Sequence, residues 1–156
     1  MQAISIRQPW AWATARGHRP LSNQGEPTSY RGTVLIHAAM RVDLSSCDHP
    51  QIRAAGWDPN DPLAALGAVV AVAELTAVCD DGPACQCGPW AERGEYHWRL
   101  ESVQPLLRPV IALGYMDGLW EVSAAVAANV RRMLTGAPRP REPREGSPAQ
   151  GRAFSR

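Results

Sequence analysis

Short apolar segments separated by glycine- and proline-rich connections characterise this chain of 156 residues. Proline-free runs rich in valine, isoleucine and aromatic residues predict strands. These runs cover residues 3–6, 33–38, 67–79, 96–103 and 119–122. Several strands with few helices between them favour an α+β fold, a small mixed β-barrel flanked by helices, over a parallel sheet.

Helix signals occur at both ends of this pattern. Proline in the first turn and glycine after the last predict a helix over residues 9–16. Ser123 can cap a final helix, in which apolar residues recur at helical spacing until Gly136 stops it. Residues 43–62 contain many helix and strand breakers, so they predict a long connection with a short helix near residues 51–55.

The chain length fits one domain, which we place at residues 1–136. Residues 137–156 are rich in arginine and proline and poor in apolar residues, so they predict a disordered tail. The formal net charge is +1, and the tail, with five arginines against two glutamates, carries the positive excess. The sequence shows no signal peptide or membrane span, so we expect a cytoplasmic protein with no membrane partner.

All 16 basic residues are arginine. The absence of lysine excludes a lysine general base, a Schiff base and a Walker-type phosphate loop. Of the four cysteines, Cys85 and Cys87 could join Cys79, or Cys47 and His49, in a zinc site. The spacing differs from the familiar C-x-x-C, so we expect reduced thiols and no metal or cofactor.

The segment from Ser5 to Trp10 combines a hydroxyl, an arginine and an amide just before a predicted helix. Exposed backbone N–H groups at a helix start attract anions, and Arg7 would reinforce that attraction. Trp10 and Trp12 are two positions apart and point to nearly opposite faces, so one is expected in the core and the other in a cleft.

Two residues on predicted strands are further candidates. Alternation along the strand places Glu74 on the same face as Val70 and Val72, where an unpaired carboxylate is costly and often marks a site or an ion pair. His37 lies on another predicted strand, although a histidine there more often makes a structural hydrogen bond.

Five separated motifs resemble the ASCH (activating signal cointegrator homology) family of the PUA-like superfamily. They are ISIRQPWAW at residues 4–12, YRGTVLIHA at 30–38, GAVVAVAEL at 67–75, the His97-Trp98 pair in YHWRLESVQPL, and GLWEV at 118–122. The resemblance implies a barrel flanked by helices, a cleft beside the RQPW segment and a role related to RNA or DNA.

Some ASCH members resemble nucleic-acid binders, some ribonucleases and some amidohydrolases of N4-acylated cytidine. The resemblance to the amidohydrolases places Arg19 at the position of their lysine, Ser22 at that of their threonine, and Glu74 at that of their glutamate. Arginine stays protonated and cannot replace lysine as a general base. The K-x-x-E-N-R pattern of many relatives retains only Asn23 of its last three residues.

These observations leave three hypotheses. A binding module would contact phosphates through arginines, bond a base through side-chain amides and stack it on tryptophan; its residues would be Ser5, Arg7, Gln8, Trp10, Trp12, Arg19, Asn23, Arg31 and His37. A hydrolase would use Arg19, Ser22 and Glu74 as catalytic residues. A protein-interaction domain would leave the cleft empty. We favour the module, with RNA, DNA or a nucleotide as partner and the oligomeric state open.

Overall fold

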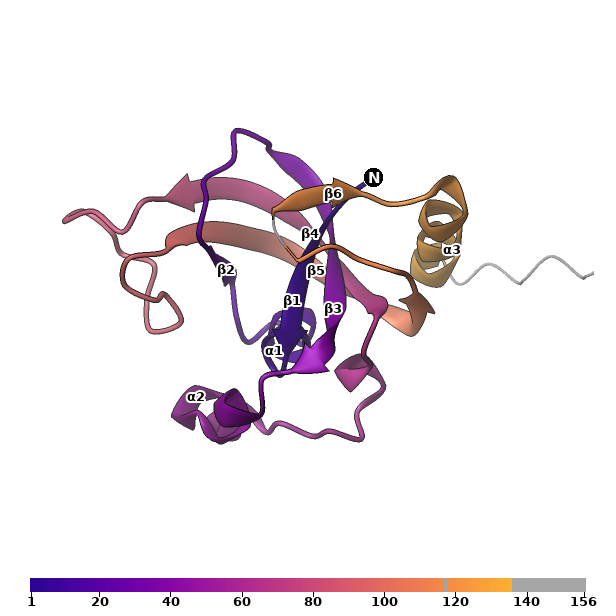
Figure 1. The fold of residues 1–156 in the computed structure, drawn as a ribbon, viewed down its shortest axis with the longest axis horizontal. Helices are drawn as coiled ribbons and strands as arrows, with labels where there is room; N and C mark the ends of the chain where they lie inside the picture. Colours follow the sequence, from indigo (N-terminus) through magenta and orange to yellow (C-terminus); the bar gives the residue numbers. More distant parts are fainter. Residues whose placement is uncertain (117, 136–156) are drawn as a thin grey trace, which may run out of the picture.

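The computed structural model describes residues 1–116 and 118–135. Six strands form one mixed sheet in the order β2-β5-β4-β3-β1-β6 (Figure 1). The strands are β1 (Gln2–Gln8), β2 (Leu21–Gln24), β3 (Gly32–Val42), β4 (Ala68–Cys79), β5 (Tyr96–Ile111) and β6 (Leu119–Glu121). The helices are α1 (Trp10–Ala15), α2 (Pro50–Ala55) and α3 (Ala124–Thr135), with 3₁₀ turns at Leu44–Asp48 and Pro62–Ala64.

The predicted α+β class is confirmed, and the sheet is barrel-like without closing. β1 and β3 pair in parallel, whereas the other strand pairs are antiparallel. The edge strands β2 and β6 do not pair with each other in the part of the chain that the structure describes. The predicted barrel is therefore an open one with two free edges. No helix in the described ranges has the length and apolarity that crossing a bilayer requires.

Two apolar cores cover the two faces of the sheet. One core joins α1 and α2 to the sheet through residues such as Ile4, Trp12 and Leu75. The other joins α3 to the opposite face through residues such as Leu35, Val72 and Val130. Figure 1 shows α3 set apart from α1 and α2 across the sheet. The loops at the ends of the strands can then vary without disturbing either core.

The structure differs from the sequence-based elements mainly in β2 and β5. β2 is only four residues long and mostly polar, so its pattern gave no strand signal. β5 continues past residue 103, its predicted end, and passes through Pro105 to Ile111. The pairing of β4 with β5 is irregular on both sides of Ala71–Val72, next to this proline. The predicted short helix near residues 51–55 is present as α2. The predicted tail at 137–156 lies outside the described residues.

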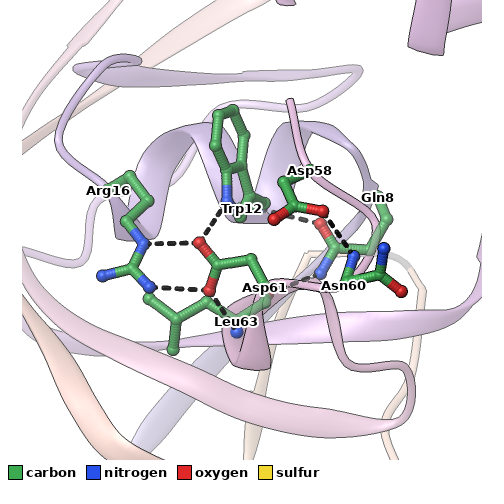
Figure 2. Close-up of polar contacts among 7 residues, drawn as sticks. All are labelled: Gln8, Trp12, Arg16, Asp58, Asn60, Asp61 and Leu63. Carbon is green, nitrogen blue, oxygen red and sulfur yellow. Dashed lines mark hydrogen bonds and ion pairs between the residues drawn. The ribbon is translucent and has the colours of Figure 1, made fainter. Parts of the chain in front are cut away.

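Gln8 links α1 to the segment that precedes β4 through side-chain hydrogen bonds (Figure 2). Its side chain is fully buried, and its Nε2 donates to the carbonyl oxygens of Leu63 and Ala65 at 2.8 and 3.0 Å. Its Oε1 accepts from the backbone N–H of Trp12 at 2.8 Å. The prediction that Gln8 contacts a base is therefore wrong, because every bond of its amide goes to buried backbone.

Asp61 makes a second connection between the same two segments (Figure 2). Its Oδ2 accepts from Trp12 Nε1 and Arg16 Nε, both at 2.9 Å. Its Oδ1 accepts from Arg16 Nη2 at 2.6 Å and from the Leu63 N–H at 2.9 Å. The hydrogen bonds from Arg16 are the main cause that lowers the pKa of Asp61 to about 2. Trp12 is thus a core residue bonded to Asp61, and the prediction that it contacts the ligand is wrong.

The pKa of Asp61 makes stability depend on pH. In the unfolded chain Asp61 regains an ordinary pKa near 4, so between about pH 4 and pH 2 the unfolded state binds more protons than the folded state. Asp61 therefore stabilises the fold above about pH 4, and this contribution disappears as the pH falls toward 2. Asp61→Asn should cost roughly 1–3 kcal/mol at neutral pH. Urea unfolding across pH should show this difference shrinking in acid, and a constant difference would contradict the assignment.

Candidate ligand-binding cleft

A cavity of about 320 Å³, a size in the range of ligand pockets, opens between the part of β1 beyond its pairing with β6 and the outer edge of β2. It arises because β6 pairs with β1 only at Gln2–Ile4, and β2 pairs only with β5. The rest of the β1 edge and the outer edge of β2 then face the same space. The lining residues are Ser5, Ile6, Arg7, Trp10, Arg19, Ser22, Asn23, Gln24, Glu92, Glu95 and Met116.

Arg19 is the least ordinary residue of this lining. Its side chain is only 4% exposed, and its guanidinium carbon lies 5.1 Å from the centre of the Trp10 ring. Within the described residues Nε has no hydrogen-bond partner, and no carboxylate lies within ion-pair distance of the guanidinium. Burial lowers the pKa of Arg19 to about 10, with partial opposition from the charge of Glu92. Arg19 therefore stays cationic at neutral pH in an unusually dry position.

Positively and negatively charged side chains both line the cleft. Arg7 is exposed on the β1 edge beside the buried Arg19. Glu92 and Glu95 face them from the loop that joins β4 to β5. A ligand that complements this lining carries an anionic group and hydrogen-bond donors together.

Asn23 holds the loop that carries these glutamates. Its Nδ2 donates to the carbonyl oxygen of Trp90 at 3.0 Å, and its Oδ1 accepts from the N–H of Glu92 at 3.1 Å. The Trp90 ring meets the Trp10 ring edge-on with centroids 6.2 Å apart. Because both ends of its amide are occupied, Asn23 shapes the cleft wall.

Ser5 and His37 connect the cleft to a second hollow. Trp120 Nε1 donates to Ser5 Oγ at 3.1 Å, and Ser5 Oγ lies 2.9 Å from His37 Nδ1. His37 Nε2 lies 2.8 Å from the carbonyl oxygen of Ala112, which can only accept, so Nε2 carries the proton and Ser5 donates to Nδ1. Burial lowers the pKa of His37 and so favours this neutral form, and the bond to Ala112 partly opposes that shift.

The second hollow, of about 230 Å³, shares part of its lining with the cleft. Ser5, Arg7 and Met116 line both. His37, Met40 and Arg41 are among the residues that line the second hollow alone. Arg7 thus stands at the boundary of two adjoining depressions.

The structure brings most of the predicted site residues together. Ser5, Arg7, Trp10, Arg19, Ser22 and Asn23 line the cleft, and His37 lies next to it. Of the two tryptophans of the first helix, Trp12 enters the core and Trp10 lines the cleft, as predicted. Arg31 is not among the lining residues, and its Nη1 donates to the carbonyl oxygens of Thr28 and Tyr30 at 2.9 and 2.7 Å.

Glu74 also lies away from the cleft lining. It sits on β4 between Ala73 and Leu75, which both enter the core beneath α1, so alternation directs it to the opposite face. Its Oε1 accepts from Thr33 Oγ1 at 2.6 Å. Val70 packs in the same core as Ala73 and Leu75, so the prediction that Glu74 shares a face with Val70 is wrong. The alternation along β4 is interrupted there, because its pairing is irregular between Val69 and Ala71.

Sequence reasoning missed the residues that loops bring to the cleft. Glu92 and Glu95 come from the connection between β4 and β5, and Met116 precedes β6. Their sequence neighbourhoods carry no motif, and the tertiary fold alone brings them to the cleft, for Glu92 with the help of the hydrogen bonds of Asn23. Ile6 and Gln24 are the remaining lining residues.

No protein-family model matches the chain, and no curated protein sequence matches it. Among solved structures, the chain is similar to the crystal structure of ASCH from Zymomonas mobilis, with a TM-score of 0.51 and 14% sequence identity over 85% of this chain and 94% of that one. A mutant of the same protein matches with the same TM-score and identity, covering 96% of its chain. The ASCH fold that the motifs predicted is confirmed.

Proposed function

We propose that the cleft binds one nucleotide unit of an RNA or DNA strand, with the phosphate on Arg7 and Arg19. The observation that carries this proposal is the buried guanidinium of Arg19, whose Nε has no hydrogen-bond partner and which forms no ion pair within the described residues. A buried charge without a partner costs several kcal/mol, so a protein that retains one normally receives the partner from a ligand.

Phosphate suits the two arginines better than a single-atom anion such as a halide would. A guanidinium donates along two parallel directions that match phosphate oxygens, and it also stacks on aromatic faces. The guanidinium carbon of Arg19 already makes a cation–π contact with the Trp10 ring, while the exposed Arg7 can reach a phosphate from the rim.

The glutamates favour a nucleotide over a bare polyanion. Glu92 and Glu95 would repel a ligand made only of phosphates, whereas a carboxylate accepts well from the exocyclic amino group of a base. We therefore assign the base to the side of the loop and expect amino-bearing bases to bind better than uracil or thymine.

The second hollow offers a path for a neighbouring nucleotide. It adjoins the cleft at Arg7, and Arg41 and the exposed Met40 are among its other lining residues. A cationic groove that follows the backbone is typical of surfaces that bind unpaired strands. A single-stranded segment is thus a better ligand than a rigid duplex.

The geometry favours binding over the hydrolase hypothesis. Arg19 and Ser22 both line the cleft, but Glu74 does not, and Arg19 is protonated at neutral pH. The predicted group of Arg19, Ser22 and Glu74 therefore lacks the residue that would move the proton.

The test compares two arginine substitutions. Arg7→Ala should weaken binding of a short labelled single strand about tenfold to a hundredfold, since hydrogen bonds to a charged group contribute about 1.5–3 kcal/mol. Arg31→Ala removes an exposed arginine outside the cleft lining and should change the affinity little. Fluorescence anisotropy with cytosine, adenine and uracil oligomers of RNA and DNA, over a salt series, measures both.

Equal losses for the two variants would mean that the ligand responds to overall charge, and would contradict the cleft assignment. We expect the oligonucleotides to remain intact after incubation with the wild-type protein. Cleavage of a strand or deacylation of an N4-acylcytidine by the wild-type protein would instead favour the hydrolase hypothesis.

A further inference from the structure

Three cysteines and a histidine gather where β4 and β5 meet the loop at residues 80–95. The side-chain ligand atoms of Cys79, Cys85, Cys87 and His97 all lie within 4.8 Å of one another. In a tetrahedral zinc site with Zn–S bonds of about 2.3 Å, neighbouring sulfurs are roughly 3.7 Å apart. The four groups therefore need only small side-chain adjustments to reach that geometry.

The backbone fixes this arrangement in advance. Cys79 and His97 are direct cross-strand partners on β4 and β5. Cys85 and Cys87 approach from the loop, where the N–H of Cys85 donates to the carbonyl oxygen of Gly82 at 2.9 Å in a turn. Two ligands thus come from rigid strands and two from a C-x-C turn, a combination that the spacing alone did not indicate.

His97 presents the correct nitrogen to the cysteines. Its Nε2 lies 2.7 Å from the carbonyl oxygen of Glu92, which accepts and therefore keeps the proton on Nε2. Nδ1 then carries the free lone pair, and it lies 3.3 Å from Cys85 Sγ. Metal-binding histidines commonly bond a carbonyl or carboxylate in this way, which fixes ring and tautomer.

We propose that Cys79, Cys85, Cys87 and His97 bind one structural zinc ion. Three sulfurs and one imidazole suit zinc rather than magnesium or calcium, which prefer oxygen ligands. Four protein ligands complete a tetrahedron, so the site is closed and supplies no catalytic water. An adjoining hollow of about 490 Å³, lined in part by Cys85 and Cys87, gives the ion an entry path.

Zinc would order the loop between β4 and β5. The loop has no helix or strand of its own and contains several glycines and prolines, so its ordering needs a partner. It also carries Trp90, Glu92 and Glu95, which pack on Trp10 or line the cleft. The zinc site stands independently of the proposed ligand, because its evidence is the Cys and His geometry alone.

The test uses the full chain, produced without a polyhistidine tag in zinc-supplemented medium and purified without chelator. Elemental analysis should find about one zinc per chain. Cys85→Ser and Cys87→Ser should each lower the zinc affinity at least tenfold, measured by competition with a chromogenic chelator. Cys47→Ser is the matched control, because Cys47 lies outside the cluster and its Sγ contacts the Asp43 carbonyl oxygen.

Cobalt gives a second readout on the wild-type protein. Co²⁺ should produce the visible bands of a tetrahedral site with thiolate charge transfer, and zinc should displace it at one equivalent. Zinc well below one per chain even after reconstitution of the reduced protein would overturn the proposal. So would equal losses in Cys47→Ser and Cys87→Ser, or a native protein whose mass and thiol count reveal a disulfide within the cluster.

Discussion

Arg19→Met should make the protein more stable, by roughly 1–3 kcal/mol, although it removes a buried residue. The guanidinium is buried without a hydrogen bond at Nε or an ion pair in the described chain, so these interactions do not compensate for the free-energy cost of its desolvation. Replacing even a buried ion pair with apolar side chains of similar size is often neutral or stabilising by about 1–4 kcal/mol, and Arg19 has no such partner to lose in the described chain. The cation–π contact with Trp10 offsets only part of this gain. Chemical unfolding of both proteins without ligand measures the difference.

Arg16→Met is the control for this expectation. Arg16 forms two hydrogen bonds with Asp61, so the same substitution there leaves a carboxylate without its partner. It should destabilise the protein. If Arg19→Met destabilised the protein as much, Arg19 would be a structural residue. Interactions within the folded protein would then compensate for the free-energy cost of burying its guanidinium.

Gln8→Ala should give the largest loss of stability, about 2–4 kcal/mol. The substitution leaves two carbonyl oxygens and one N–H without their partner in a buried region and opens a small cavity. At a temperature where the variant is folded, ligand affinity should change little, because Gln8 does not line the cleft. Urea unfolding and anisotropy on the same samples separate the two effects.

Gln104→Ala removes an exposed glutamine from β5 and should leave both quantities nearly unchanged. If Gln8→Ala instead kept its stability and lost affinity, the original prediction of a contact between Gln8 and a base would be restored.

Local patterns were sufficient to predict most of the fold. The strands near residues 3–6, 33–38 and 67–79 and both terminal helices follow from alternation, β-branched residues and helix start signals. β2 could not be predicted because one leucine followed by three polar residues lacks any strand pattern, and its partner in the described sheet, β5, is distant in sequence.

The candidate site, like the fold, was predictable from the sequence only in part. Arg7 and Trp10 were found because they lie at a recognisable helix start, and Arg19 because the family resemblance places it at the position of a lysine. The role of Gln8 was misjudged because a buried backbone carbonyl is invisible in the sequence. Glu74 was misplaced by an irregularity in strand pairing, and Glu92 and Glu95 were missed because tertiary structure alone brings them to the cleft.

The affinity of Arg19→Met for a short single-stranded oligonucleotide tests the central claim most directly. The comparison uses wild type and variant, each as the full chain and as a chain ended after Gly136, at matched salt. We predict that wild type binds in both lengths and that Arg19→Met binds at least tenfold more weakly in both. Unchanged affinity in Arg19→Met, or binding that depends only on residues 137–156, would contradict a nucleotide site in the cleft.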